Sequence, residues 1–425
     1  MTARSRRTCK SRMSNAGSVA PRRLVLREHE ESAPVWLSRT ERDALPLLHP
    51  GVQIQAAGSR GDRYVLRPDQ RVGVVALPTL VIEIQPKIPM PSALHLISVA
   101  SDAIRWQPQA PDYDDDSSFT DLVAILLARL VGLATRRGLL HGYRPETEAA
   151  QAPRGRVLFE EFIRRRFGHA PPIDIEHDLF TPDVTENRIL LAALQALRRQ
   201  SLRTKAARSA LTDAQQALGG VSLVHFTLGA LPEYIPSTPL NTHYQPALTL
   251  ALMVLRSAYL KLGAGMGRGN AFLVDMNLVF EKYLRNALRL ALNLNERSFP
   301  DRPPKTYLDR GSQVELRPDL TLIERGRIVW VGDAKYKILP DTKRINSDLY
   351  QLHAYATALA LPQATLVYGT SSEPISHEHV AIGSGSRLQV QELNLNVSRN
   401  EIDKQVAELT SRVRYPQGAR VAAAG

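Results

Sequence analysis

The spacing of apolar residues divides the chain into regions with different periods. From Arg23 to about Pro91, apolar residues form short runs separated by Gly, Pro and Asp, a pattern typical of strands joined by turns. We therefore expect a β-rich N-terminal domain over residues 23–115. From about residue 116 to residue 265 the apolar residues recur every three or four positions, which predicts a helical middle domain.

The last third of the chain alternates between helical and strand-like patterns. In order, it shows a helix, a hairpin, a second helix and two strands, at residues 275–292, 313–337, 346–361, 364–370 and 388–397. This order predicts a compact α/β domain over residues 266–400, followed by a short helix and tail over residues 401–425. The fold class expected for the whole chain is multidomain α+β.

Charge suggests a class of partner. The formal net charge is +12 and the pI is about 9.9, and such a surplus favours contact with polyanions such as nucleic acid. Residues 1–22, which are rich in Arg and Ser and which we expect to be a disordered tail, supply part of this charge. The charge therefore suggests nucleic acid without identifying it.

Composition excludes several other classes of protein. Cys9 is the single cysteine, which excludes a disulfide framework and a cysteine metal site and suits a reducing cytoplasm. No apolar run reaches the length of a membrane span, so we expect a cytoplasmic protein without membrane contact. The glycine-rich stretch at 263–270 lacks the Gly-Lys-Ser/Thr ending of a phosphate-binding loop. We expect this chain to bind no nucleotide itself.

The predicted hairpin at 313–337 carries two carboxylates and an amine between apolar runs. A three-residue loop, Glu324 to Gly326, would let the glycine take the left-handed conformation. Because strand side chains alternate, the resulting register places Asp319, Asp333 and Lys335 on one face. A two-residue loop would place Asp319 on the opposite face.

This arrangement of side chains suits phosphodiester hydrolysis. Two carboxylates a few ångströms apart are costly unless a cation neutralises them, and Mg²⁺, with Mn²⁺ as the alternative, is the expected ion. Lys335 could position the attacking water and stabilise developing charge. The motif alone is weak evidence, since Pro-Asp occurs at six places and Asp-x-Lys recurs at 341–343. Its position on adjacent strands makes it stronger.

Two residues on the flanking helices are further candidates. Glu281, on the helix before the hairpin, could supply a third carboxylate to the metal, directly or through water; the alternative is a surface glutamate. Gln351 shares a helix face with Asp348 and Tyr355 through three- and four-residue spacing. It is a candidate polar contact to the site or to DNA, and a glutamine at the edge of the core is the alternative.

These stretches resemble the PD-(D/E)xK nuclease superfamily and, more closely, the McrC family, the nuclease subunit of McrBC modification-dependent restriction systems. The similar stretches span residues 70–370 and include "VGVVALPTLVIEIQPKIP", "MNLVFEKYL", "LRPDLTL", "VGDAKYK" and "SDLYQLHAYA". The resemblance implies a restriction-endonuclease-like C-terminal domain. In it, Asp319, Asp333 and Glu281 would be metal ligands, and Lys335 the catalytic lysine.

The resemblance also implies partners. These are double-stranded modified DNA, such as DNA containing 5-methylcytosine, and a McrB-like hexameric AAA+ GTPase. The N-terminal part of the chain would dock into that ring and stimulate GTP hydrolysis. Two alternatives stay open: a non-catalytic activator of an AAA+ ring, and a DNA repair nuclease that acts alone.

Overall fold

The computed structural model describes residues 21–58, 62–102, 117–166, 172–227, 229–259, 270–337, 345–370 and 376–413. The predicted N-terminal tail lies almost entirely outside these ranges, and so does most of the glycine-rich stretch at 263–270. The described residues form ten α-helices and several sheets, so the chain is mixed α+β. None of the described helices is long and apolar enough to cross a bilayer.

The N-terminal part is β-rich, as its short apolar runs predict. Its main sheet has the order β1 (Arg22–Arg27), β6 (Leu80–Gln85), β5 (Arg71–Ala76) and β10 (Asn270–Asp275). A smaller sheet contains β2 (Val35–Trp36), β4 (Arg63–Arg67) and β3 (Gln53–Ala56), and α1 (Arg39–Leu48) lies between β2 and β3 in the chain. Strand β10 follows the middle region in the chain and pairs antiparallel with β5.

Helices form the body of the middle region. They are α3 (Phe119–Thr135), α5 (Thr185–Arg198), α6 (Lys205–Gln216) and α7 (Gln245–Tyr259), preceded in the chain by α2 (Met90–Ala100). Ser118 and Asp121 form a capping box that begins α3. Buried apolar residues of α3, α5, α6 and α7 belong to one large core cluster that continues into α8 (Met276–Ala291).

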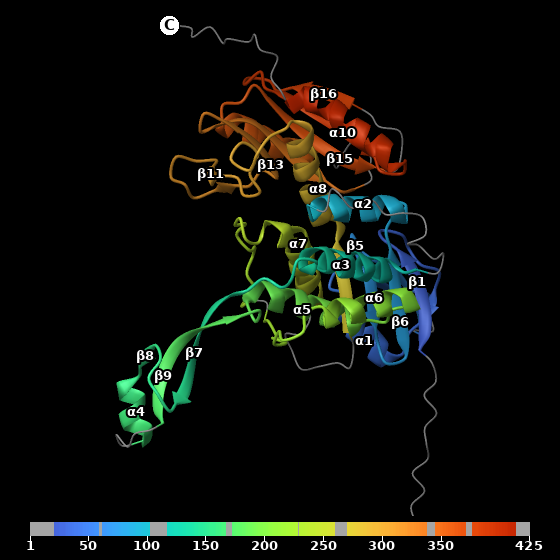
Figure 1. Cartoon of the computed structure of the whole chain (residues 1–425). Coiled ribbons are helices and arrows are strands. Elements are labelled where there is room, and N and C mark those ends of the chain that lie inside the picture. Colours follow the sequence, from blue (N-terminus) through green and yellow to red (C-terminus); the bar gives the residue numbers. More distant parts are fainter. Residues whose placement is uncertain are drawn as a thin grey trace, which may run out of the picture.

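The expectation of an entirely helical middle region is wrong for residues 142–181. Here β7 (Gly142–Ala150), β9 (Ile173–Thr181) and β8 (Arg156–Val157) form an antiparallel sheet. With α4 (Phe159–Arg166) they make an arm that projects away from the helical body (Figure 1). Every second residue of β7 is exposed and the others are only half-buried. The strand therefore lacks the apolar run that would have indicated it.

The C-terminal part is built on a five-stranded sheet. Its order is β13 (Leu320–Glu324), β14 (Arg327–Lys335), β15 (Gln363–Thr370), β17 (Arg387–Asn394) and β16 (Ser376–Val380). The pairs β14–β15 and β15–β17 are parallel. Three helices flank the sheet, α8, α9 (Ile345–Ala358) and α10 (Arg399–Val413), and a small hairpin of β11 (Thr306–Tyr307) and β12 (Glu315–Leu316) precedes β13.

Alternation along β14 assigns its two faces to different helices. Trp330 and Tyr336 belong to the core cluster that contains residues of α8 and α10. Val331 belongs to the cluster that contains Leu352 and Tyr355 of α9. From Trp330 onward, odd-numbered side chains of β14 therefore face α9, and even-numbered ones face α8 and α10.

The turn between β13 and β14 differs from the predicted one. It has two residues, Arg325 and Gly326, both with positive φ, 49° and 76°, as in the type I′ turns that match strand twist. A bulge follows, because Leu322 pairs with Trp330 while Ile323 pairs with Ile328. The extra residue in the bulge shifts the pairing by one position. Asp319 therefore lies on the same face as Asp333 and Lys335, as the three-residue loop would also have placed it. The predicted loop is wrong, but its consequence for the carboxylates holds.

Candidate functional site

The candidate site lies where β14 ends, on the face toward α9. Asp333 and Lys335 stand two residues apart on this strand, and Lys335 Nζ lies 2.5 Å from Asp333 Oδ2. The Asp333 side chain is 1% exposed, and its Oδ1 receives no hydrogen bond from the described residues. A buried carboxylate with a free oxygen is an uncommon arrangement, since buried polar atoms are normally satisfied.

Asp319 reaches the same place from the neighbouring strand. The pairing of Leu320 with Gly332 puts Asp319 opposite Asp333 at the next position of the hairpin. Its Oδ2 accepts a hydrogen bond of 2.9 Å from the backbone N–H of Ala334. The structure therefore brings together the three side chains Asp319, Asp333 and Lys335, as their parity predicts.

The electrostatics of this group favour a bound cation. Burial, and then the charge of Asp333, raises the pKa of Asp319 to about 7. Burial also raises the pKa of Asp333, although Lys335 opposes the rise. Burial alone would lower the pKa of Lys335, but the two carboxylates outweigh it and the pKa is raised. One lysine thus faces two crowded carboxylates, and a second cation would relieve their repulsion.

Glu281 of α8 lies near this pair but is engaged elsewhere. Burial and the charge of Asp319 raise the pKa of Glu281, so Glu281 lies close enough to feel the charge of Asp319. Its carboxylate is paired with Arg285, four residues further along the helix. Arg285 also donates to the backbone oxygen of Asp319, at 2.8 Å. Within the described ranges, no three His, Cys, Asp or Glu side chains gather as a metal site. The structure therefore brings Asp319 and Asp333 together, and Glu281 lies nearby without joining them.

Gln351 of α9 connects to the amine of the site. Lys335 Nζ donates to Gln351 Oε1 at 3.4 Å, and Gln351 Nε2 donates to the hydroxyl of Tyr355 at 2.6 Å. That hydroxyl in turn donates to the backbone oxygen of Arg317 at 3.0 Å, two residues before Asp319. The chain of hydrogen bonds links α9 to β14 and to the segment just before β13. A role for Gln351 in contacting substrate stays a prediction.

Three neighbouring residues were missed by sequence reasoning. Arg285 holds Glu281, and Lys337 pairs at 2.5 Å with Asp348, whose Oδ2 also accepts a 2.6 Å bond from the hydroxyl of Tyr368. Spacing could have found two of them. Arg285 stands four residues after Glu281 on a helix, and Lys337 stands two residues after Lys335. Nothing local could have found Tyr368, which comes from β15.

The raised pKa of Asp319 predicts a pH-dependent stability of the metal-free protein. Asp319 has a pKa of about 7 when folded and about 4 when unfolded. The folded state therefore keeps the proton on Asp319 to a higher pH than the unfolded state does. The free energy of unfolding falls as pH rises from about 4 to about 7, because the unfolded state loses this proton first. Asp319→Asn should remove this loss, so it should stabilise the protein more at pH 8 than at pH 5. Urea unfolding in EDTA at the two pH values measures the difference.

The control for this experiment is Asp43→Asn, at a position on α1 whose side chain is 57% exposed. It should change stability little and equally at both pH values. An equal effect of Asp319→Asn at pH 5 and pH 8 would show that burial does not raise the pKa of Asp319.

The chain is similar to restriction-system proteins over much of its length. Residues 66–369 match the family described as "McrBC 5-methylcytosine restriction system component". The chain is 22% identical over 294 residues to the Type IV methyl-directed restriction enzyme EcoKMcrBC of Escherichia coli K12, covering 65% of this chain and 82% of the relative.

The fold is also similar to that of a solved structure. A half-complex from a tetradecameric assembly of Thermococcus gammatolerans McrB AAA+ hexamers with bound McrC contains a similar chain. The TM-score is 0.51 and the identity 16%, over 92% of this chain and 100% of the other. The Thermococcus gammatolerans McrBC complex gives a TM-score of 0.41 and 17% identity, over 64% and 88% of the two chains. The first likeness supports a common fold.

Proposed function

Because this chain belongs to the McrC family of McrBC 5-methylcytosine restriction system components, we propose that it is the Mg²⁺-dependent DNA endonuclease subunit of such a system. It cleaves phosphodiester bonds of modified double-stranded DNA together with an McrB-type AAA+ GTPase, whose GTP hydrolysis it stimulates. One observation carries the nuclease assignment: Asp319 and Asp333 converge beside Lys335 at the end of β14. The C-terminal sheet with its flanking helices serves as the PD-(D/E)xK nuclease domain.

The two carboxylates fit a hard divalent cation. Both supply oxygen ligands, Asp333 is buried and Asp319 is half-buried, and Asp333 keeps an oxygen that no described hydrogen-bond donor satisfies. Asp319 and Asp333 would hold Mg²⁺, or Mn²⁺, with Glu281 in reach through water once Arg285 releases it. The ion, when bound, supplies positive charge that stabilises the transition state and acidifies water.

The other side chains act on the substrate. Lys335 donates hydrogen bonds toward the attacking water and the phosphate oxygens, where charge develops. Gln351 accepts from Lys335 and keeps the ammonium directed at the carboxylates. Tyr355 bonds both Gln351 and the backbone at Arg317, and so holds the segment that leads to Asp319 against α9. Such preorganisation is the main contribution a protein makes to phosphoryl transfer.

A plasmid cleavage assay tests this function. Methylated and unmethylated plasmids are incubated with Mg²⁺, with and without GTP and the cognate McrB-type protein. The proposal expects cleavage only of methylated DNA in the complete mixture. GTPase stimulation without cleavage would instead support the activator alternative, and cleavage without GTP or partner would support a repair nuclease that acts alone.

Metal binding has a readout that is independent of cleavage. Isothermal titration with Mn²⁺ is expected to detect binding to the wild-type chain at pH 8. Asp319→Asn should lose most of that affinity, because it removes a carboxylate ligand. Lys335→Met should retain it, since it removes an ammonium that competes with the metal for Asp333. Equal binding by all three chains would show that the ion binds elsewhere.

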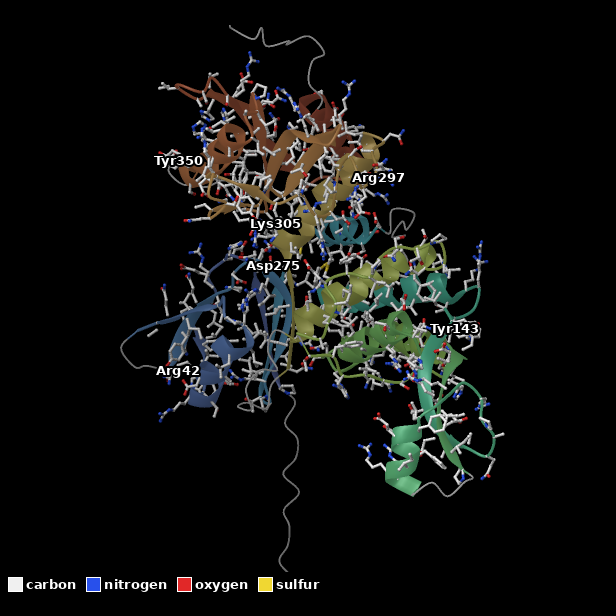
Figure 2. All side chains as sticks on the ribbon, turned by 90° about the vertical axis from the view of Figure 1, so that its left-hand side faces the viewer. Arg42, Tyr143, Asp275, Arg297, Lys305 and Tyr350 are labelled. Carbon is white, nitrogen blue, oxygen red and sulfur yellow. The ribbon has the colours of Figure 1, made fainter. Side chains whose placement is uncertain are left out.

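The projecting arm is a better candidate for partner docking than the N-terminal β-rich part, where we expected it. Four large apolar residues of the arm are more than half exposed: Tyr143, Phe159, Ile163 and Phe180. Figure 2 shows Tyr143 near the base of the arm. The rings of Tyr143 and Phe180 lie 5.2 Å apart, and Phe159 and Ile163 stand one helical turn apart on α4. Exposed apolar groups of this kind are typical of protein interfaces, and a projecting arm can reach a partner without moving the nuclease part.

A further inference from the structure

A buried polar cluster joins the N-terminal sheet to the end of the strand that carries Lys335. Glu28 directly follows β1, Lys87 follows β6 by two residues, and Tyr336 directly follows β14. Glu28 and Tyr336 are each 1% exposed. They are separated by 308 residues in the chain. We call these three residues the clasp.

The contacts within the clasp are specific. The hydroxyl of Tyr336 donates to Glu28 Oε1 at 2.7 Å, and the backbone N–H of Lys87 donates to the same oxygen at 2.7 Å. Lys87 Nζ donates to the backbone oxygen of Tyr336 at 3.3 Å and lies 3.8 Å from the centre of its ring. The N-terminal part therefore holds both the side chain and the main chain of Tyr336.

Maintaining this cluster is costly. Burial raises the pKa of Glu28 to about 7 and lowers that of Lys87 to about 8, so each group resists its charged form. Apolar residues of similar size would commonly stabilise this contact between the two parts of the chain equally well. Polar groups at this position fix one orientation, because each hydrogen bond requires a particular geometry.

The held residue is the direct neighbour of Lys335. The Tyr336 ring packs at 6.0 Å from the ring of Phe280 on α8, so it is fixed from two sides. Because side chains alternate, Tyr336 points away from the face that carries Asp333 and Lys335. The clasp thus restrains the strand end without occupying the site. Figure 2 shows Asp275, where β10 passes into α8, at the same junction between the two parts.

We propose that Glu28 and Lys87 are positioning residues of the nuclease site, which hold Tyr336 so that Lys335 stays directed at Asp333. The inference rests on the proposed nuclease function. In this proposal the N-terminal sheet is a structural component of the active site, because it positions Lys335 through Tyr336.

Cleavage kinetics test the clasp in the full chain with its GTPase partner. Glu28→Leu and Tyr336→Phe should each lower the single-turnover cleavage rate of methylated plasmid by about tenfold to about a hundredfold, as small misplacements of reacting groups do. GTPase stimulation and DNA affinity should not change. Glu28→Gln should recover most of the rate, since its amide oxygen can accept both hydrogen bonds.

Glu83→Leu is the matched control. Glu83 lies on β6 in the same sheet, is 3% exposed and pairs with Arg23 and Arg203 rather than with the clasp. It should cost stability but leave the cleavage rate per folded molecule unchanged. The double variant Glu28→Leu/Tyr336→Phe should be no slower than Glu28→Leu, because the two residues share one interaction. Additive losses, or an equal loss in Glu83→Leu, would overturn the proposal.

Hydrogen exchange separates this inference from the proposed function. The peptide that covers the end of β14 should exchange faster in Glu28→Leu and Tyr336→Phe than in wild type, and at the wild-type rate in Glu83→Leu. If the wild type cleaves no DNA, the nuclease proposal fails, while the exchange rates still decide whether the clasp orders this strand end. Unchanged exchange in both clasp variants would refute the clasp.

Discussion

Asp333→Asn is expected to abolish DNA cleavage while GTPase stimulation continues at the wild-type level. The substitution keeps the shape of a side chain that is 1% exposed, but it removes the charge that would bind the metal and that pairs with Lys335 at 2.5 Å. Because a bound metal ion supplies several kcal/mol of transition-state stabilisation, the loss should be about a thousandfold or more. Single-turnover cleavage of methylated plasmid measures it.

The same substitution should not destabilise the metal-free protein. Burial raises the pKa of Asp319, and the charge of Asp333 adds to that rise, so the two carboxylates repel one another when both are charged. Removing one charge relieves this repulsion. Glu83→Gln, at a position on β6 that is 3% exposed, is the control and should cleave normally. Loss of both cleavage and GTPase stimulation in Asp333→Asn would mean that Asp333 has a structural role.

Replacing the arm by a short linker is expected to abolish GTPase stimulation and, with it, GTP-dependent cleavage. Gly142 and Thr181 are paired neighbours at its base, and antiparallel partners lie about 5 Å apart. A few glycines in place of residues 143–180 can therefore close the chain. Asp183 should keep the base intact, because it remains bonded to Arg188 and Ser222. GTP hydrolysis by the McrB-type partner, with and without the variant, is the measurement.

A milder variant checks that the apolar surface of the arm is responsible. Phe159→Ser with Ile163→Ser changes two exposed residues of α4, 67% and 61% exposed, and should weaken stimulation while leaving the melting temperature unchanged. Trp36→Ala, at a 50% exposed position of the N-terminal part, tests the rival docking surface. Normal stimulation by the arm deletion together with loss in Trp36→Ala would return the docking role to the N-terminal part.

A truncation that removes the β-rich N-terminal part, such as deletion of residues 24–110, would not test docking. Strand β10 pairs with β5 of the N-terminal sheet, and Val72, Val74 and Leu96 belong to the same core cluster as residues of α7 and α8. Removing these residues would expose much of that core, so loss of activity would report unfolding. The independent β-rich domain inferred from the pattern is thus integrated with the rest of the chain.

Local pattern alone predicted much of the candidate site. The helical periods at 275–292 and 346–361 correspond to α8 and α9, and the alternating runs correspond to β13 and β14. The prediction that Asp319, Asp333 and Lys335 share one face is confirmed, although the turn has two residues and the bulge supplies the needed shift in pairing. Periodicity reports which residues share a face, and it does so wherever one face is buried.

The sequence by itself therefore determined the elements and the side chains that one hairpin brings together, because those depend on spacing along a few neighbouring residues. Only the tertiary structure decided which distant segments meet. It paired β10 with β5, brought Gln351 to Lys335, placed Arg285 against the backbone of Asp319 and joined Glu28 to Tyr336. Such contacts leave no local signature, since they arise from the packing of whole sheets and helices around shared cores.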